Sequence, residues 1–297
     1  MSDCILVLNP KSGGGKRADQ TRRLADEHGY RVWESTGRGE TYELARDAVS
    51  EDASLVVAAG GDGTLNEVVR GVDDAGGLDS TTLGVVPAGT GNNFADRLGI
   101  QGIEHSFQLL ESGRRRRIDL GVANGRLFVN SCVGGLTADS SVATTPEFKK
   151  RWGVLAYVIN TMREYRDFEG LDIDVHDENG AELYAGEAIG VLVGNGRRFV
   201  GEPGVQANME DGMLNIVVIE DRPARSLASD EAIRRFLRRD RDHLTRLLAP
   251  EMHLTVHGDE PRHFSLDGEG LSTTELKARS RPQCLRFCVS KTYQPRP

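Results

Sequence analysis

The chain has 297 residues, 38% of them hydrophobic, and a formal net charge of −8. This length accommodates one large domain or two ordinary ones with a packed core, and the acidic balance argues against non-specific binding to nucleic acids. The N-terminal stretch MSDCILVLNP has too short an apolar run for a secretory signal. Because no stretch approaches the ~18 apolar residues needed to span a bilayer, we expect a cytoplasmic protein.

The first third of the chain alternates between strand and helix patterns. Short apolar runs predict strands at residues 4–8, 30–34, 55–59 and 83–86, and helical spacing predicts helices at 17–28, at 41–50, from 65 and from 94. Alternation of this kind predicts a parallel sheet wrapped by helices. In such sheets, ligands bind beyond the carboxyl ends of the strands.

Glycine-rich turns follow three of the predicted strands. They are Asn9-Pro10-Lys11-Ser12-Gly13-Gly14, Gly60-Gly61-Asp62-Gly63-Thr64 and Gly89-Thr90-Gly91-Asn92-Asn93. Without Cβ atoms, a phosphate can approach the backbone N–H groups closely, and a helix start adds unpaired donors and a favourable dipole. Each turn alone is compatible with an ordinary turn, and the first does not match a Walker A loop. Three such turns at one sheet edge favour nucleotide binding.

Asp62 stands out because a carboxylate repels phosphate unless it binds a cation or accepts a proton. It is therefore a candidate for metal handling or catalysis. Glu67, on the first turn of the following helix, either favours the helix dipole or faces the nucleotide. Asn92 or Asn93 is expected to cap the next helix. Asp119 either pairs with a neighbouring arginine or lines a cleft.

From about residue 118 the pattern changes to strands, predicted at 171–175, from 183, and at 188–193, 213–219, 252–256, 263–266 and 285–289. Helical patches are predicted near 152–165 and 230–248. This half is typical of a mostly antiparallel β-sandwich. We predict a first domain over residues 1–121 and a second over 122–283, and the last strand, about 284–297, could return to the first.

Two late motifs place carboxylates beside glycine. Asp211-Gly212 is typical of a hairpin turn, or it offers Mg²⁺ an Asp oxygen together with nearby backbone carbonyls. Asp267 and Glu269 flank Gly268. Turn chemistry alone explains this motif, but paired carboxylates also raise one another's proton affinity, which suits a general base.

Two further features have open alternatives. The basic, amphipathic segment 233–248 is either a solvated helix packed on its domain or a helix resting on an anionic membrane surface. The four cysteines, Cys4, Cys132, Cys284 and Cys288, form no CxxC pair. They are expected to be buried thiols, with zinc or disulfide roles as the alternative.

Taken in order, these motifs resemble those of the diacylglycerol kinase catalytic-domain family, which includes bacterial diacylglycerol kinases, related lipid kinases and sphingosine kinases. The residues that carry the resemblance are Asn9-Pro10-x-Ser12-Gly13, Gly60-Gly61-Asp62-Gly63-Thr64, Gly89-Thr90-Gly91-Asn92, Asp211-Gly212 and Asp267-Gly268-Glu269. The resemblance covers nearly the whole chain. The Gly-Gly-Asp-Gly-Thr motif is also shared with NAD kinases and, more distantly, with phosphofructokinases.

The resemblance implies an ATP-binding α/β domain, a β-sandwich substrate domain, and catalysis in the cleft between them. It implies ATP and Mg²⁺ as cofactors, a lipid alcohol such as diacylglycerol as acceptor, and a role in phospholipid metabolism. Peripheral contact with the inner membrane face stays the alternative that the basic segment 233–248 offers. The implied ATP contacts are Asn9, Pro10, Lys11, Ser12, Gly13, Thr36, Gly61, Asp62, Gly63, Thr64, Leu65, Asn66, Glu67 and Thr90.

The resemblance also implies roles for the late carboxylates. Glu269, supported by Asp267, takes the proton from the substrate hydroxyl, while Asp62 organises Mg²⁺ or shares the base role. A structural magnesium lies at Asp211, helped by the carbonyls of Asn208 and Met213.

One position departs from the family pattern, because Asn93 stands where relatives often have Asp. Losing that charge could weaken a metal or water network near the phosphates. Two rival interpretations stay open: an NAD kinase, which has another acceptor, and a nucleotide- or lipid-binding regulator that has lost catalysis, which Asn93 favours. The sequence specifies neither the acceptor lipid nor the oligomeric state.

Overall fold

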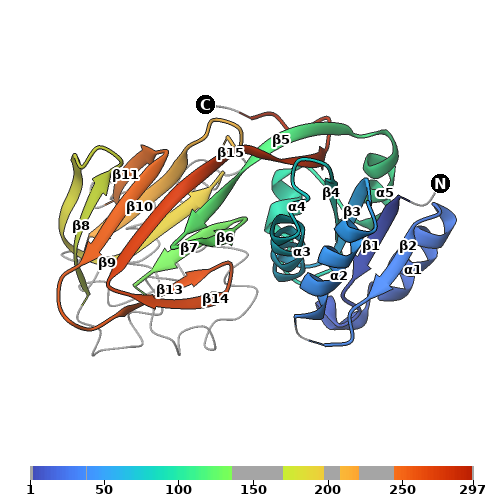
Figure 1. Ribbon diagram of the computed structural model, residues 1–297, viewed down its shortest axis with the longest axis horizontal. Helices are drawn as coiled ribbons and strands as arrows, with labels where there is room; N and C mark the ends of the chain where they lie inside the picture. Colours follow the sequence, from blue (N-terminus) through green and yellow to red (C-terminus); the bar gives the residue numbers. More distant parts are fainter. Residues whose placement is uncertain (1–2, 38, 136–169, 197–207, 221–243, 296–297) are drawn as a thin grey trace, which may run out of the picture. The chain divides into compact units, whose positions relative to one another are not determined.

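The computed structural model describes residues 3–37, 39–135, 170–196, 208–220 and 244–295. The chain forms two compact units (Figure 1). Unit 1 comprises Met1–Leu120 and Pro282–Pro297, and unit 2 comprises Gly121–Arg281. The two long strands β5 (Arg114–Ala123) and β15 (Glu275–Val289) contribute residues to both units.

Unit 1 is built on a parallel sheet with the strand order β15-β4-β3-β1-β2. Its strands are β1 (Cys4–Leu8), β2 (Arg31–Glu34), β3 (Leu55–Gly60), β4 (Thr82–Pro87) and the end of β15, where Arg286 and Phe287 pair with β4. Every residue of β3 and β4 is buried. Strands that are covered on both faces need continuous apolar runs, which is why these segments are readable from the sequence.

Five α-helices accompany this sheet in the described part of unit 1: α1 (Ala18–Glu27), α2 (Glu40–Ser50), α3 (Asp62–Asp74), α4 (Asn93–Arg97) and α5 (Ile103–Ser112). A short 3-10 helix, η1 (Ser12–Gly15), lies in the first glycine turn. Helix α2 packs on α3, and α1 packs on α5. Gly71 permits the first of these contacts, because a Cβ there would lie 2.3 Å from the Tyr42 carbonyl oxygen. The core under the helices includes Leu6, Val57 and Phe107.

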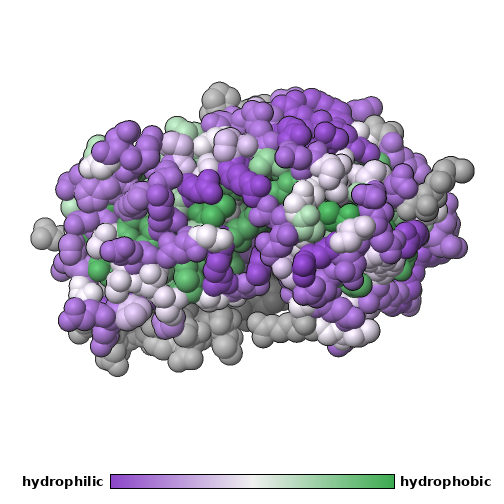
Figure 2. All heavy atoms as spheres, in the orientation of Figure 1, coloured by the Kyte–Doolittle hydropathy of each residue, from purple (hydrophilic) through white to green (hydrophobic). Residues whose placement is uncertain are grey.

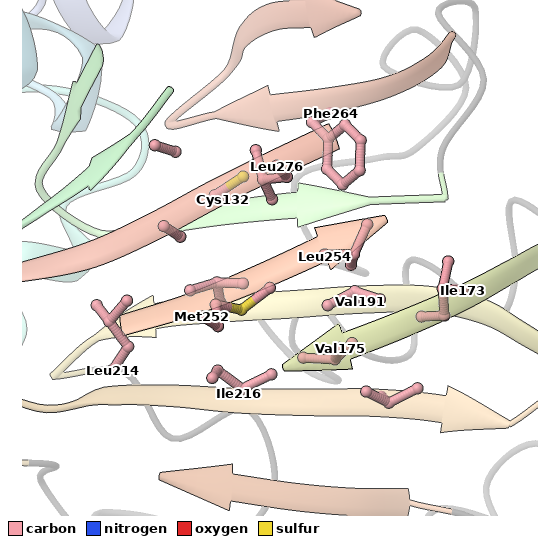
Figure 3. Packing of buried hydrophobic residues seen from close by; sticks show 14 of the residues in the cluster. Cys132, Ile173, Val175, Val191, Leu214, Ile216, Met252, Leu254, Phe264 and Leu276 are labelled. Atoms are coloured by element: carbon pink, nitrogen blue, oxygen red, sulfur yellow. The ribbon is translucent and has the colours of Figure 1, made fainter. Parts of the chain in front are cut away.

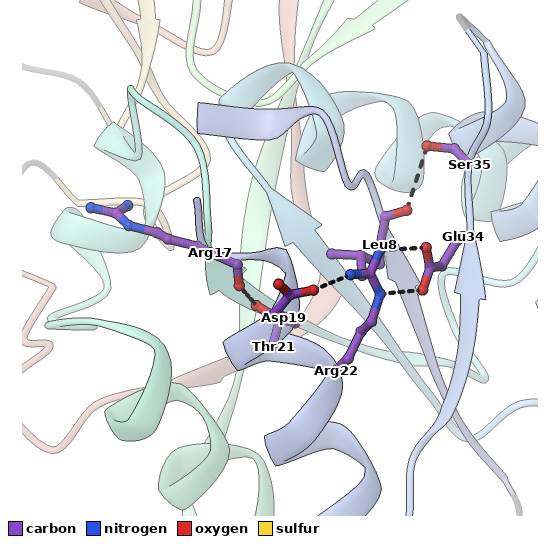
Figure 4. A network of polar contacts seen from close by, with 7 residues as sticks. All are labelled: Leu8, Arg17, Asp19, Thr21, Arg22, Glu34 and Ser35. Atoms are coloured by element: carbon purple, nitrogen blue, oxygen red, sulfur yellow. Dashed lines mark hydrogen bonds and ion pairs between the residues drawn. The ribbon is translucent and has the colours of Figure 1, made fainter. Parts of the chain in front are cut away.

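A polar network fastens the edge strand β2 to helix α1 (Figure 4). The Arg22 guanidinium donates to both Glu34 oxygens at 2.7 and 2.9 Å and to Asp19 at 2.6 Å. Beyond β2, the Ser35 hydroxyl donates to the Leu8 carbonyl. Water screens ion pairs that are as exposed as those of Arg22, so they fix the position of β2 more than they add stability.

Unit 2 is a mostly antiparallel β-sandwich. Its strands, besides parts of β5 and β15, are β6 (Arg126–Phe128), β7 (Ser131–Gly134), β8 (Leu171–Asp177), β9 (Glu182–Asn195), β10 (Leu214–Glu220), β11 (Leu244–Ala249), β12 (Glu251–Val256), β13 (Arg262–Leu266) and β14 (Glu269–Thr273). The long strand β9 pairs with β7, β8 and β10. Alternating inward residues form the core, which Figure 3 shows around Met252, Leu254 and Phe264.

The structure corrects the helix predicted near 230–248 over its last residues. Residues 244–249 are strand β11, which pairs antiparallel with β10, and its two ends, Leu244 and Ala249, are buried. The apolar spacing there is compatible with a helix, but pairing with β10 decides the conformation, because short apolar runs are ambiguous. Residues 230–243 and the helix predicted at 152–165 lie outside the described residues.

The four cysteines are free thiols, of which Cys132 and Cys288 are buried, as predicted, and Cys4 and Cys284 are half-buried. No helix of the described part of the chain is long and apolar enough to cross a membrane. The face in Figure 2 is mostly hydrophilic, with hydrophobic residues visible in smaller areas between polar ones.

Candidate functional site

The structure packs the three glycine turns of unit 1 into one assembly at the carboxyl ends of β1, β3 and β4. The Thr64 hydroxyl lies 3.3 Å from both the Asn9 amide nitrogen and the Ser12 hydroxyl, which joins the first turn to the second. A Cβ on Gly89 would lie 2.3 Å from the Cα of Gly61, which brings the second turn against the third. Several glycines are therefore needed for contact between the turns, a reason that the sequence alone does not suggest.

Arg17 and Gly13 join the first turn to the third. The Arg17 guanidinium donates to the carbonyls of Pro87 and Gly89 at 3.2 and 3.1 Å. Gly13 has φ +59, and a Cβ there would lie 2.6 Å from the Ala88 carbonyl oxygen, so a side chain is excluded by both strain and space. Sequence reasoning missed Arg17, because its partners are some 70 residues away and leave no local signal.

Open backbone remains at two glycines of this assembly. Gly14 and Gly63 have no atom within 4 Å of a Cβ built on them. Gly63 lies in the first turn of α3, whose N-terminus has no side-chain cap. The N–H groups of the first turn lack intrahelical acceptors and form the positive end of the helix dipole. This turn can therefore receive a phosphate.

Asp62 links the second turn to helix α4. Its carboxylate accepts hydrogen bonds from the Asn93 backbone N–H at 2.9 Å, the Asn93 side-chain amide at 3.0 Å, and the Phe94 N–H at 3.0 Å. It thus caps α4. Asn92 was a candidate cap, but its side chain instead exchanges two hydrogen bonds with the backbone of Gly89. The Asn93 amide therefore serves as a donor to Asp62.

A second network joins the first turn to the segment after β2. Asn9 accepts a hydrogen bond from the Lys11 N–H at 3.1 Å, and the Lys11 ammonium donates to the Thr36 carbonyl at 2.8 Å. The Thr36 N–H and hydroxyl both donate to Glu40, at 2.6 and 2.8 Å. These hydrogen bonds and that of the Gly37 N–H hold the pKa of Glu40 below its usual range. The sequence analysis did not single out Glu40.

The remaining predicted nucleotide contacts differ in what they can offer. Leu65 is buried in the core, so only its backbone is available. Asn66 is 3% exposed, and among the described residues its buried side-chain oxygen has no hydrogen-bond partner. Thr90 is exposed, and Pro10 and Glu67 are half-buried. Of these residues, Asn66 best suits a ligand, because its side-chain oxygen can accept a hydrogen bond from a ligand N–H or O–H group.

In unit 2, Asp267 and Gly268 form the two-residue turn between β13 and β14. They have φ values of +49 and +101, and Leu266 pairs with Glu269 across the turn. Asp-Gly suits such a hairpin because both positions need positive φ. The Asp267 carboxylate also accepts hydrogen bonds from three consecutive N–H groups, those of Val129, Asn130 and Ser131, at 2.6, 3.1 and 2.8 Å.

Glu269 begins β14 and pairs with Arg126 on β6. The Arg126 guanidinium lies 2.8 Å from a Glu269 carboxylate oxygen, and its other terminal nitrogen donates to the Gly270 carbonyl at 2.8 Å. Sequence reasoning missed Arg126, because no local pattern shows a contact between residues 143 positions apart. The short segment 126–131, which we call the clamp segment, thus holds both late carboxylates.

Two other predicted carboxylates have structural partners. Asp211 is not in a tight hairpin: it precedes β10, and its carboxylate accepts a hydrogen bond from the Met213 N–H at 3.0 Å, while the Asn208 side chain accepts one from Glu210. Buried Asp119 accepts a hydrogen bond from the Gln283 N–H at 2.7 Å. The described residues include no group of three His, Cys, Asp or Glu that could hold a metal. Magnesium at Asp211 would therefore rely on carbonyls and water.

Comparison with known proteins matches both units. Residues 3–123 match the family model for the diacylglycerol kinase catalytic domain, and residues 132–289 match the model for the YegS C-terminal NAD kinase beta sandwich-like domain. A Streptococcus pneumoniae serotype 4 protein whose name contains the words lipid kinase is 32% identical over 227 residues, covering 74% of this chain and 76% of that protein.

Two further relatives extend the match. The Bacillus subtilis (strain 168) protein named "Diacylglycerol kinase" is 30% identical over 230 residues, covering 74% of each chain. The crystal structure of a diacylglycerol kinase from Bacillus anthracis str. Sterne superimposes with a TM-score of 0.76 at 23% identity, covering 98% of both chains. The likeness to that structure supports the fold, an N-terminal α/β unit followed by a β-sandwich.

Proposed function

This chain belongs to the diacylglycerol kinase catalytic-domain family and is a kinase, and we propose that it transfers the γ-phosphate of ATP to the hydroxyl of a lipid alcohol such as diacylglycerol. Unit 1 binds the nucleotide and unit 2 supplies the base. The observation that carries the proposal furthest is the packing of three glycine turns around the uncapped start of α3.

The donor side of the proposal uses backbone more than side chains. The N–H groups near Gly63, beside the open backbone of Gly14, receive phosphate oxygens. The Asn66 side-chain oxygen, buried and unpartnered among the described residues, accepts a hydrogen bond from the nucleotide. Asn9, Lys11, Ser12, Thr36, Thr64 and Thr90 complete the proposed site.

Magnesium supplies charge neutralisation of the phosphates when it is bound. On this chain, the residues that fit a hard cation are Asp62 near the nucleotide turns and Asp211 with the carbonyls of Asn208 and Met213 in unit 2. Asp62 already accepts three hydrogen bonds from the start of α4, so its orientation is fixed before any ligand arrives. A pre-fixed carboxylate reduces the cost of ordering during phosphoryl transfer.

The acceptor side assigns the base role to Glu269. Its carboxylate takes the proton of the lipid hydroxyl as that oxygen attacks the γ-phosphorus and the bond to the β-phosphate oxygen breaks. Asp267 has a different role, because its oxygens are engaged by the clamp segment and it therefore holds the hairpin in place. Asp62 accepts three hydrogen bonds from the start of α4, and we assign it to the cation rather than to the base role.

The rival interpretations differ in their acceptor. The regulator hypothesis rests on Asn93; its amide donates to Asp62, and this contact supports a structural role for the asparagine in an active enzyme. We propose that the protein works in the cytoplasm and meets its substrate at the inner membrane face. The basic segment 233–248 gives this no support, because residues 244–248 belong to β11 and the others are not described.

One experiment separates the candidates. The purified protein is incubated with γ-labelled ATP and Mg²⁺, together with total lipid extract, diacylglycerol vesicles or NAD. The proposal predicts label in the lipid fraction, with diacylglycerol vesicles sufficient. Label in NAD would support the NAD kinase, and bound ATP without any labelled acceptor would support the regulator.

A further inference from the structure

The clamp segment joins the two late carboxylates by different chemistry. Its backbone N–H groups at Val129, Asn130 and Ser131 hold Asp267, and its first residue, Arg126, holds Glu269. Arg126 does more than form an ion pair, because the same guanidinium also donates to the carbonyl of Gly270, the residue after Glu269. One planar group therefore grips both the side chain and the backbone at the start of β14.

We propose that Arg126 is a positioning residue for Glu269: it holds the carboxylate in one orientation at the start of β14. This inference rests on the proposed function. A guanidinium suits this role because its donors lie in a rigid fork and it stays charged at every relevant pH.

The geometry distinguishes this pair from an ordinary surface contact. Both side chains are about one-third exposed, at 35% and 36%, and the pair joins β6 to β14, far apart in the sequence. By contrast, the Arg117–Asp79 pair of unit 1 is longer, at 3.3 Å, and its Asp79 side chain is 91% exposed. Arg117 thus provides a matched control, an arginine with a carboxylate partner outside the proposed site.

The test compares Arg126→Gln, Arg126→Lys and the control Arg117→Gln with the wild type. The first readout is the side-chain conformation of Glu269, measured by the NMR coupling constants of its methylene groups on the protein without substrates, with the signals assigned through Glu269→Gln. We expect one fixed rotamer in the wild type and in Arg117→Gln, couplings averaged over several rotamers in Arg126→Gln, and partial averaging in Arg126→Lys.

The second readout is kinetic and uses diacylglycerol vesicles. Arg126→Gln is expected to lower kcat about 10-fold with little change in the KM for ATP, because a misplaced base slows the chemical step without touching nucleotide binding. Arg126→Lys should recover part of the rate.

The outcomes separate the two proposals. An unchanged Glu269 conformation in Arg126→Gln would overturn the positioning role, even if the enzyme is active. A loosened Glu269 side chain in a protein that phosphorylates no lipid would leave the role of Arg126 toward Glu269 standing and overturn the kinase acceptor instead. If Arg126→Gln loses the folded NMR spectrum, Arg126→Lys decides: a lower rate with partly averaged Glu269 couplings would support the guanidinium fork, and a wild-type rate with wild-type couplings would contradict it.

Discussion

Replacing Asp267 by alanine should destabilise unit 2 locally, because this carboxylate is the acceptor for three neighbouring backbone N–H groups. Hydrogen bonds to a charged group contribute about 1.5–3 kcal/mol each. The three donors, from Val129, Asn130 and Ser131, share two oxygens in a partly buried site. Water can replace some of these bonds, so we expect a total loss of about 2–4 kcal/mol rather than the full sum.

Hydrogen exchange is the direct assay, because the affected groups are amides. A loss of about 2.8 kcal/mol corresponds to roughly 100-fold faster exchange at these positions. Asp267→Asn should show a smaller effect, since one oxygen remains. Glu269→Gln is the matched control, because it alters the same hairpin and leaves Asp267 in place. Unchanged exchange of these three amides in Asp267→Ala would refute the idea that Asp267 holds the clamp segment.

Three further predictions concern other parts of the chain. Hydrogen bonds from Thr36 lower the pKa of Glu40. The stabilisation by the Glu40 carboxylate is therefore present above the unfolded pKa of about 4.3 and is lost as the pH falls through the folded pKa. The Tm difference between wild type and Glu40→Gln should be seen at pH 7 and shrink as the pH is lowered below about 4.3. Burial raises the pKa of Cys288 to about 11 and raises that of Cys132 further. Both thiols should therefore resist alkylation at pH 8 until the protein is unfolded in urea. Rapid labelling of either thiol in the native protein would contradict its burial. Arg115 donates to the carbonyls of Leu110 and Gly113 at the end of α5. Arg115→Ala should therefore lower the free energy of unfolding by about 1 kcal/mol, measured by chemical denaturation. An unchanged denaturation midpoint would argue against this helix cap.

The elements that could be predicted from the sequence are those whose conformation is set locally. Strand β3 reads as a strand because all six of its residues are buried between helices and must be apolar. The Asp-Gly turn before Glu269 is readable because its backbone needs positive φ at both positions. Helix α5 is absent from the predicted elements although Ile103, Phe107 and Leu110 follow helical spacing, so its signal was present.

Features that depend on distant partners were not readable. Strand β14, with the polar sequence EGLST, exists because β13 pairs with it along its length. The last turn of the predicted basic helix is β11 for the same reason. No local sequence pattern identifies Arg126. The close packing of Gly61 on Gly89 gives these glycines a structural reason, whereas the sequence analysis assigns them to phosphate binding. A single sequence does not show which distant residues or strands pair with one another.

The base assignment of Glu269 is the central claim, and the most direct measurement compares turnover with nucleotide binding in Glu269→Gln. The variant keeps the size and hydrogen-bonding shape of the side chain but cannot take a proton. We expect lipid phosphorylation to fall by about 10²–10⁴-fold while the Kd for ATP, measured by calorimetry, stays within about twofold, because the proposed nucleotide site lies in unit 1 and Glu269 lies in unit 2. Turnover of Glu269→Gln at the wild-type rate would contradict the account.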